Sequence, residues 1–449
     1  MRTIPVGVTS AGYRRVVVAG SVGTFIELYD LVVYGYFATI LAERFFPEED
    51  PTAALLATFA IFAVGFFVRP FGAIIFGHVG DRFGRRPALA ASLLLMTVAT
   101  VAFGLLPTYS TVGVLAPALL LLCRLVQGLS ASAEIPGAQL LILEYAPAGQ
   151  RGRAVSINNA AGQLAAAAAA AVGLILASRL TPEQLGDWGW RLAFLLAAPI
   201  GLVGLYVRLR LLDTPAFLAL GARARTGAAP LTRALRTAKR GMLVFLIWMA
   251  VVSLGVYVVV GYLPSYLIQT AGLPRSDALT ANLVAVVTLA ASSVLGGYLV
   301  DRLPLRQVAI GVMVGVCVAA VPGFLIINEY RNLVSALIGQ SLWAIFLGAT
   351  YTVGTLMAVR LFPAAVRFSA TAVALNVGVA LFGSTAPYVC TWLVSTTANP
   401  IAPGLYLLVA AIGGLLATVF GLTRHDLESP AAPEAEPAVS IEDADRSRR

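Results

Sequence analysis

Charge is scarce in this chain. Asp, Glu, Lys and Arg make up 12% of its 449 residues, whereas 59% are hydrophobic. The mean hydropathy of +0.86 lies far above what a water-soluble domain tolerates. Apolar runs of about 20 residues or more recur along the sequence, and each could cross about 30 Å of hydrocarbon. The composition therefore excludes a soluble protein and predicts a polytopic membrane protein.

Lysine, histidine and cysteine are also rare. Lys239 is the only lysine, and the arginines lie in short segments between apolar runs, so the net charge of +9 does not indicate a nucleic-acid partner. The three cysteines, Cys123, Cys317 and Cys390, fall inside apolar runs without metal-ligand spacing, far from the two histidines. We therefore expect no metal site and no cofactor.

Enzyme motifs are missing as well. The sequence contains no GxSxG nucleophile motif, no phosphate-binding glycine loop and no set of metal ligands. A membrane enzyme is therefore not expected. Secondary active transport remains open, and so does a transporter-like sensor that binds its ligand without turnover.

What the sequence does contain is a series of apolar segments bounded by Arg, Pro or polar clusters. Nearly all Arg and Lys residues fall in the termini and the even-numbered loops, which places these in the cytoplasm of a bacterial inner-membrane protein. The twelve predicted helices cover residues 13–41, 53–77, 87–106, 114–143, 153–178, 188–211, 241–270, 279–300, 307–327, 332–360, 367–396 and 402–423.

The predicted fold is all-α, with twelve transmembrane helices in two six-helix bundles. The longest connection, rich in Arg, divides the apolar segments into two sets of six. The C-terminal tail is acidic, rich in Pro and Ala, and without apolar periodicity, so it is predicted to be disordered. The expected organisation is an N-terminal bundle (1–211), a cytoplasmic linker (212–240), a C-terminal bundle (241–424) and a disordered tail (425–449).

Loop signatures repeat between the two predicted bundles. GHVGDRFGRR at 77–86 is echoed by GYLVDRLPLR at 297–306, so that glycine, aspartate and two arginines recur at one offset. A second echo relates EYAPAGQR at 144–151 to LFPAAVR at 361–367. Corresponding loops with corresponding signatures indicate a parallel internal repeat about an axis along the membrane normal.

These stretches resemble the major facilitator superfamily. FIELYDLVVYGYFA (25–38), FFVRPFGAIIFGHVGDRFGRR (66–86), RLVQGLSASAE (124–134) and FPAAVRFSATAVALNVGVALFGSTAPYVCTWLV (362–394) are similar to its metabolite:proton symporter branch. Known members of that branch carry α-ketoglutarate, citrate, shikimate, or the osmolytes proline and betaine. The resemblance implies a cytoplasmic gate between the bundles, formed by Asp81, Arg82, Arg85, Arg86, Asp301, Arg302 and Arg306.

Ionisable residues inside the spans are few, and all of them lie in the N-terminal half. A charged side chain facing lipid at the bilayer centre costs about 2.5 kcal/mol or more, so these residues should face a cavity or each other. Glu27 and Asp30 are three residues apart in the first helix, where two carboxylates cannot both ionise cheaply. We predict proton coupling at Glu27, Asp30 and Glu134.

Arg124 is the natural counter-ion for one of these carboxylates or for a substrate carboxylate. Fixed structural pairs, Arg124 with Glu134 and Arg69 with Asp30, remain an alternative. Arg69 is the weakest functional candidate, because it could extend toward the cytoplasmic surface. The predicted substrate-binding residues are Arg124, Gln127, Tyr29, Tyr257, Tyr262, Gln340, Trp343 and Asn376.

The sequence therefore predicts a secondary active transporter that couples proton symport to uptake of a small polar metabolite. The substrate class is an organic acid or a zwitterionic osmolyte. The absence of heptads after Glu428 favours organic acids, because osmosensory members of this branch often end in a coiled coil. An exchanger of organic anions is the alternative. The expected partners are the substrate, the proton and the lipid bilayer, and the expected state is a monomer.

Overall fold

The computed structural model describes residues 10–47, 50–69, 71–72, 75–76, 85–131, 135, 139, 142–143, 146–147, 149–210, 239–362 and 364–421. Within these ranges every regular element is helical. The first half contains α1 (Ser10–Tyr36), α2 (Ala38–Phe45), α3 (Pro51–Phe67), α5 (Arg85–Gly104), α6 (Tyr109–Val112), α7 (Leu115–Ser130), α9 (Arg151–Arg179), α10 (Pro182–Gln184), η1 (Leu185–Gly189), α11 (Trp190–Leu195) and α12 (Ala197–Arg210).

The second half repeats this sequence of helices. It contains α15 (Lys239–Tyr257), η3 (Val258–Tyr262), α16 (Leu263–Gln269), α17 (Arg275–Val300), α18 (Leu305–Tyr330), α19 (Leu333–Leu361), α20 (Ala364–Gly378), η4 (Val379–Gly383), α21 (Ala386–Thr397) and α22 (Ala402–Gly421). The predicted linker and tail fall almost entirely outside the described residues.

The described helices match the twelve predicted spans. Eight spans are long and apolar enough to cross a membrane, and the pair α1 and α2, bent by 62°, makes a ninth. Three shorter apolar helices, Pro51–Phe67, Ala90–Gly104 and Leu115–Ser130, occupy the remaining positions. The chain is thus a membrane protein with twelve spans in two bundles.

Helix ends follow local capping chemistry. The Asp50 carboxylate accepts hydrogen bonds from the backbone N–H groups of Thr52 and Ala53, at 2.9 and 3.1 Å, and Pro51 occupies the first turn of α3. Asn332 and Ser335 form a reciprocal capping box at the start of α19. These caps place both helix starts within about two residues of the predicted ones.

Two long spans of the C-terminal half are interrupted by π-helical turns, η3 and η4. Pro264 follows η3 and Pro387 follows η4, and each proline lacks the N–H that would bond to the carbonyl four residues earlier. Those carbonyls belong to Val260 and Gly383, which lie within the two π-helical turns. The prolines therefore explain why α-helical geometry fails at these points, a detail that hydrophobic periodicity does not predict.

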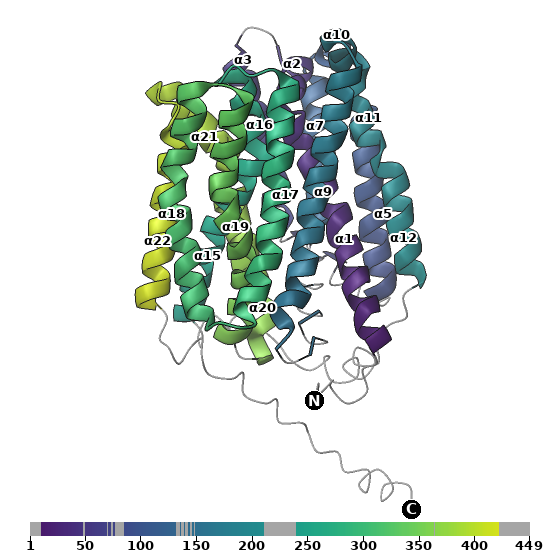
Figure 1. The fold of residues 1–449 in the computed structure, drawn as a ribbon. Helices are drawn as coiled ribbons and strands as arrows, with labels where there is room; N and C mark the ends of the chain where they lie inside the picture. The colour runs from purple at the N-terminus through teal and green to yellow at the C-terminus, as the bar shows by residue number, and fades with distance from the viewer. Residues whose placement is uncertain are drawn as a thin grey trace, which may run out of the picture.

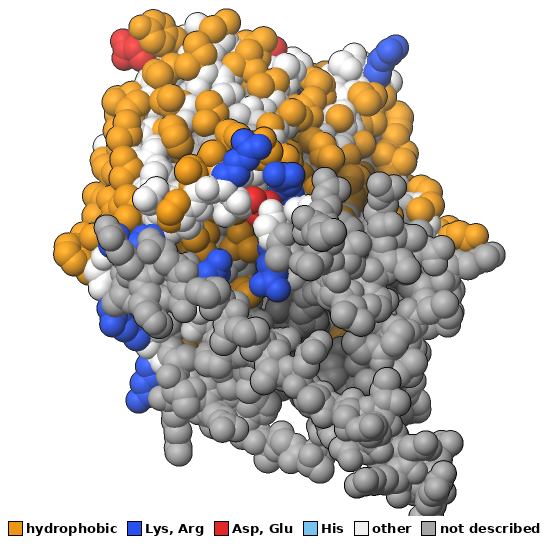
Figure 2. All heavy atoms as spheres, turned by 60° about the horizontal axis from the view of Figure 1, so that its bottom comes forward, with side chains coloured by type: hydrophobic (Ala, Val, Ile, Leu, Met, Phe, Trp, Pro, Cys, Tyr) orange, Lys and Arg blue, Asp and Glu red, His pale blue; other side chains and the backbone are white. Residues whose placement is uncertain are grey.

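The two halves stand side by side and meet along α9 and α17 (Figure 1). α1 begins and α22 ends at the same lower side, as the even number of spans requires. On that lower face, Lys and Arg side chains gather around a small acidic spot, whereas hydrophobic side chains cover the flanks (Figure 2). The lower side is therefore the cytoplasmic side.

Close contacts between the halves occur toward both ends of the bundle. Toward the outer side, a Cβ on Gly35 of α1 would lie 2.8 Å from Gly261 Cα of η3, and Arg275 donates to Thr39 Oγ1 at 3.0 Å. Toward the cytoplasm, a Cβ on Gly297 of α17 would lie 2.6 Å from the carbonyl oxygen of Gly152 on α9. Glycine at these positions lets the backbones of the two halves touch.

Candidate functional site

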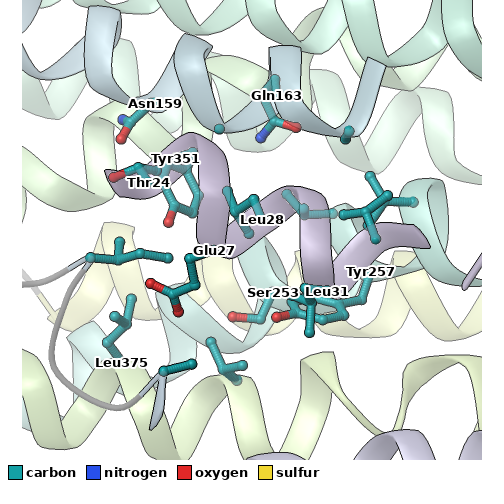
Figure 3. A pocket seen from close by; sticks show the side chains of 18 of the residues that line it. Thr24, Glu27, Leu28, Leu31, Asn159, Gln163, Ser253, Tyr257, Tyr351 and Leu375 are labelled. Carbon is teal, nitrogen blue, oxygen red and sulfur yellow. The ribbon is translucent and has the colours of Figure 1, made fainter. Parts of the chain in front are cut away.

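A cavity lies between the two halves. The close contacts between the halves, at Gly35 and Gly261 and at Gly297 and Gly152, lie on either side of it. The cavity offers about 60 Å³ to the centres of water molecules, which is room for several waters. Its polar lining comes from both halves, as Figure 3 illustrates. The polar lining residues are Thr24, Glu27, Arg69, Asn159, Gln163, Ser253, Tyr257, Tyr351 and Asn376.

Glu27 and Arg69 form an ion pair on the wall of this cavity. One guanidinium nitrogen of Arg69 lies 3.3 Å from Glu27 Oε1, and the two side chains are 11% and 2% exposed, respectively. The Arg69 guanidinium also lies over the ring of Phe66, 4.5 Å from its centroid. Arg69 therefore turns toward the cavity and does not extend toward the cytoplasmic surface, the possibility that made it the weakest candidate in the sequence.

The described residues of the C-terminal half that line the cavity form an uncharged wall. Ser253 and Tyr257 come from α15, Tyr351 from α19 and Asn376 from α20. Figure 3 shows the Glu27 carboxylate directed among side chains of this wall, including Ser253 and Tyr351. This arrangement can bind a small polar molecule between the charged pair on one side and neutral hydrogen-bonding groups on the other.

A second polar network lies within the N-terminal half. Asp30 accepts hydrogen bonds from the Thr100 hydroxyl and, at 3.2 Å, from the amide of Gln127. The same Gln127 accepts from the guanidinium of Arg124 at 3.1 Å. Because none of these four residues lines the main cavity, Glu27 and Asp30 occupy different surroundings. Asp30 instead borders a much smaller cavity between α1, α5 and α12.

Aromatic rings separate the two networks. The Arg124 guanidinium lies 4.6 Å from the centroid of the Phe62 ring, and Phe62 is 5.4 Å from Phe66, on which Arg69 rests. Phe66 in turn meets Tyr257 of the other half edge to face, at 5.4 Å. The network around Asp30 is thus linked to the cavity by rigid aromatic packing.

Several of the predicted site residues lie away from the cavity. Tyr29 donates a hydrogen bond to the carbonyl of Ala193 at 3.0 Å, inside the N-terminal half. In the C-terminal half, Gln340 accepts a hydrogen bond from Asn282 at 3.1 Å. Trp343 packs on Phe324 and Tyr262 on Tyr266, with ring centroids 5.6 Å apart in both pairs. Of the predicted substrate-binding residues, Tyr257 and Asn376 line the cavity. Glu134 lies outside the described residues.

Sequence reasoning missed Asn159 and Gln163 on the N-terminal side, as well as Ser253 and Tyr351 on the other side. Asn159 and Gln163 are four residues apart, on the face of α9 that contacts α1. Two amides on one face of an otherwise alanine-rich helix were the available signal. Ser253 and Tyr351 carried no such signal, because single polar residues are common in membrane helices.

At the cytoplasmic side, Asp301 joins the two halves. Its carboxylate accepts hydrogen bonds from the backbone N–H groups of Gly152 and Arg153, at 2.8 and 3.2 Å, and lies 3.6 Å from the Arg153 guanidinium. Burial raises the pKa of the Asp301 carboxyl, while these hydrogen bonds and the Arg153 charge oppose the shift. The carboxylate therefore holds the first turn of α9 against the end of α17.

The remaining predicted gate residues differ in their placement. Arg302 lies over the ring of Tyr298, and Arg306 donates to the carbonyl of Val419 at 3.3 Å, within the C-terminal half. Arg85 and Arg86 begin α5, but their side chains are outside the description, as are Asp81 and Arg82 entirely.

We expect Asp301→Ala to loosen the cytoplasmic contact between the halves. Hydrogen bonds to a charged group contribute about 1.5–3 kcal/mol, and the half-exposed Arg153 adds little. A cysteine introduced at the buried Ser293 should then react at least about tenfold faster with a maleimide applied from the cytoplasmic side. Asp277→Ala, at the other end of α17, is the control. An unchanged rate would show that Asp301 does not hold the halves together.

No group of three or more His, Cys, Asp or Glu side chains in the described part of the chain could hold a metal ion.

Comparison with known proteins agrees with this architecture. The family model of the Major Facilitator Superfamily matches residues 20–387. The proline/betaine transporter of Escherichia coli strain K12 is 32% identical over 438 residues, covering 95% of this chain and 86% of that protein. The glycine betaine/proline/ectoine/pipecolic acid transporter OusA of Dickeya dadantii is 34% identical over 418 residues, covering 91% and 83%.

Solved structures share the fold at lower sequence identity. The proton:xylose symporter XylE bound to 6-bromo-6-deoxy-D-glucose has a TM-score of 0.72 at 19% identity, covering 94% of this chain and 99% of that one. The inward open conformation of XylE from E. coli has a TM-score of 0.67 at 18% identity, covering 93% and 99%. This likeness establishes the arrangement of the helices.

Proposed function

The chain belongs to the major facilitator superfamily, and from this premise we propose that it is a proton-coupled symporter for a small zwitterionic osmolyte. It is a multi-pass protein of the bacterial inner membrane. The observation that carries the proposal is the cavity between the halves, whose described lining offers one carboxylate, one guanidinium and several neutral polar groups. Contacts between the halves on either side of the cavity suit a protein that opens alternately to each side.

The names of the relatives favour an osmolyte over an organic acid as the proposed substrate. Absence of a coiled-coil tail favoured organic acids, yet the names of the relatives described above refer to proline and betaine. The cavity supports the same choice. Its described lining holds charges of both signs, whereas a site for a di- or tricarboxylate needs an excess of positive charge.

Asp30 is our candidate for the proton-carrying group. Its carboxyl is buried, accepts hydrogen bonds from Thr100 and Gln127, and is linked to Arg124 through Gln127. Loss of the proton would place a negative charge one amide away from the guanidinium, which would draw α1 and α7 together. Because α1 also carries Glu27 into the cavity, protonation and substrate binding would act on the same helix.

The proposal includes no enzymatic step. The protein would act as a monomer, with the N-terminal bundle (1–211) supplying the ionisable groups and the C-terminal bundle (241–424) supplying neutral contacts. Its partners would be the substrate, the proton and the bilayer, without nucleic acid.

Transport in proteoliposomes tests this function. With the outside one pH unit more acidic, radiolabelled glycine betaine or proline should accumulate several-fold, up to about tenfold, above its external concentration, because this gradient supplies about 1.4 kcal/mol per proton. A protonophore should abolish the accumulation. Citrate, α-ketoglutarate and shikimate should compete weakly.

Other outcomes would overturn the proposal. Counterflow of a substrate without dependence on the pH gradient would indicate an exchanger. Saturable binding without flux would indicate a sensor. Accumulation of a tricarboxylate in preference to both zwitterions would show that the substrate class is organic acids.

A further inference from the structure

The described residues that face the cavity carry balanced charges. Of the described residues that line it, Glu27 and Arg69 alone carry formal charge, one of each sign. They come from neighbouring segments, α1 and the turn after α3, and both are largely shielded from solvent. A bound molecule therefore meets both charges at once, in surroundings where an unbalanced charge is expensive.

The Arg69 guanidinium keeps capacity for further hydrogen bonds beside its ion pair with Glu27. The distance of 3.3 Å between the Arg69 guanidinium and Glu27 Oε1 is longer than a typical charge-assisted hydrogen bond of about 2.7–2.9 Å. A guanidinium carries five N–H donors, and Nε of Arg69 has no hydrogen-bond acceptor among the described residues. The face of the guanidinium rests on Phe66, which fixes its plane. Arg69 is thus oriented to bind a carboxylate.

The opposite wall suits a cationic nitrogen. Tyr257 lines the cavity, and its ring is held edge to face against Phe66, at 5.4 Å. Tyr351 lines the same wall, close to Glu27 in Figure 3. Aromatic faces together with a carboxylate are the groups that attract secondary and quaternary ammonium ions.

We infer that Glu27 and Arg69 divide a zwitterionic substrate between them, Arg69 binding its carboxylate and Glu27 its cationic nitrogen. The inference rests on the proposed transport function and adds the recognition chemistry to it. A zwitterion that enters between the two side chains replaces each partner's counter-charge with its own, so the cavity stays neutral. A dicarboxylate would add uncompensated negative charge, and a simple cation would add uncompensated positive charge.

This assignment separates two functions that the sequence grouped together. Glu27 serves the substrate, while Asp30, three residues further along α1 and away from the main cavity, remains available for the proton. Arg69 then takes the role of substrate anchor that the sequence suggested for Arg124. Arg124 is held by Gln127 and by the rings of Tyr34 and Phe62.

Ligands that lack one charge test the inference on the wild-type protein. Choline keeps the trimethylammonium group of glycine betaine but lacks its carboxylate, and 3,3-dimethylbutyrate is the isostere with carbon in place of the charged nitrogen. Each should inhibit glycine betaine uptake at least about 30-fold more weakly than glycine betaine itself, the usual effect of leaving one partner of a buried charge pair unmatched.

Two variants assign each charge to its residue. In Arg69→Gln, the preference for glycine betaine over choline should fall to within about threefold, while the preference over 3,3-dimethylbutyrate remains. In Glu27→Gln, the reverse is expected. Arg179→Gln and Glu43→Gln, which change exposed residues of the same types, are the matched controls and should keep both preferences. Binding in detergent by calorimetry gives the same comparison for a variant that no longer transports.

The outcomes separate this inference from the proposed function. Absence of zwitterion uptake by the wild-type protein would defeat the transport proposal itself. Uptake of glycine betaine with equally strong inhibition by choline or 3,3-dimethylbutyrate would leave transport intact and overturn the division of charges. The same holds if both variants keep both preferences. Because the wild-type comparison needs no substitution, a variant that fails to fold does not remove the test.

Discussion

Asp30→Asn is expected to abolish proton-driven accumulation while substrate exchange across the membrane continues. Asparagine keeps the size of the side chain, and its amide oxygen can accept the hydrogen bonds that Thr100 and Gln127 donate to Asp30. It cannot gain or lose a proton in the accessible pH range. Uptake driven by a pH gradient should therefore fall to the level of protein-free liposomes, whereas counterflow of labelled substrate should remain within about threefold of wild type.

Asp187→Asn provides the matched control for this experiment. Asp187 lies in η1, is 63% exposed and pairs with Arg44 of α2. Its charge therefore does not contact the buried network around Asp30. The control should accumulate substrate like the wild-type protein. If Asp30→Asn also accumulates substrate in response to the pH gradient, the proton is carried elsewhere, and Glu134 becomes the residue to test.

Gly297→Leu should stop both accumulation and exchange. A Cβ at this position would lie 2.5 Å from Ser156 Oγ and 2.6 Å from the Gly152 carbonyl oxygen, both on α9, and leucine adds three further carbons. The clash involves the other half of the protein, so each bundle can fold but the two cannot close at the cytoplasmic side. We expect transport at background in both assays, because a carrier that cannot close one side cannot complete its cycle.

Gly311→Leu is the control for this substitution. Gly311 lies in α18, and a Cβ there would meet no atom within 4 Å beyond the neighbouring backbone of its own helix, so transport should be unchanged. A cysteine introduced at Ser293 reports the conformation directly, and its reaction with a maleimide from the cytoplasmic side should be fast in Gly297→Leu. Transport by Gly297→Leu at the wild-type rate would show that this close approach of the halves is not needed.

The sequence predicted the fold well, because membrane spans can be identified by their length and hydrophobicity. Arginines at the cytoplasmic side and caps such as Asp50 define where the helices begin and end. The bend at Phe37 and the π-helical turns before Pro264 and Pro387 were not predicted. They depend on how neighbouring helices satisfy the backbone groups that the break leaves open.

The site was harder to predict, since it depends on how each helix is rotated. Glu27 and Asp30 were expected to influence each other as close carboxylates, yet Glu27 pairs with Arg69, and Asp30 is bonded to Thr100 and Gln127. α1 lies between the cavity and the interior of its own bundle, so a rotation of about 60° separates the two environments. The position of Arg69 was hard to predict for a similar reason, because its long side chain could reach either the surface or the cavity.

The neutral wall of the cavity has a consequence for engineering. Ser253, Tyr257, Tyr351 and Asn376 shape the space available to a ligand without contributing formal charge. A combinatorial library confined to these four positions would vary the size and hydrogen-bonding pattern of the accepted cargo while the energy source stayed the same. If the chain transports zwitterions as proposed, such a library would be a practical starting point for strains that import chosen amino-acid-like nutrients or stress protectants.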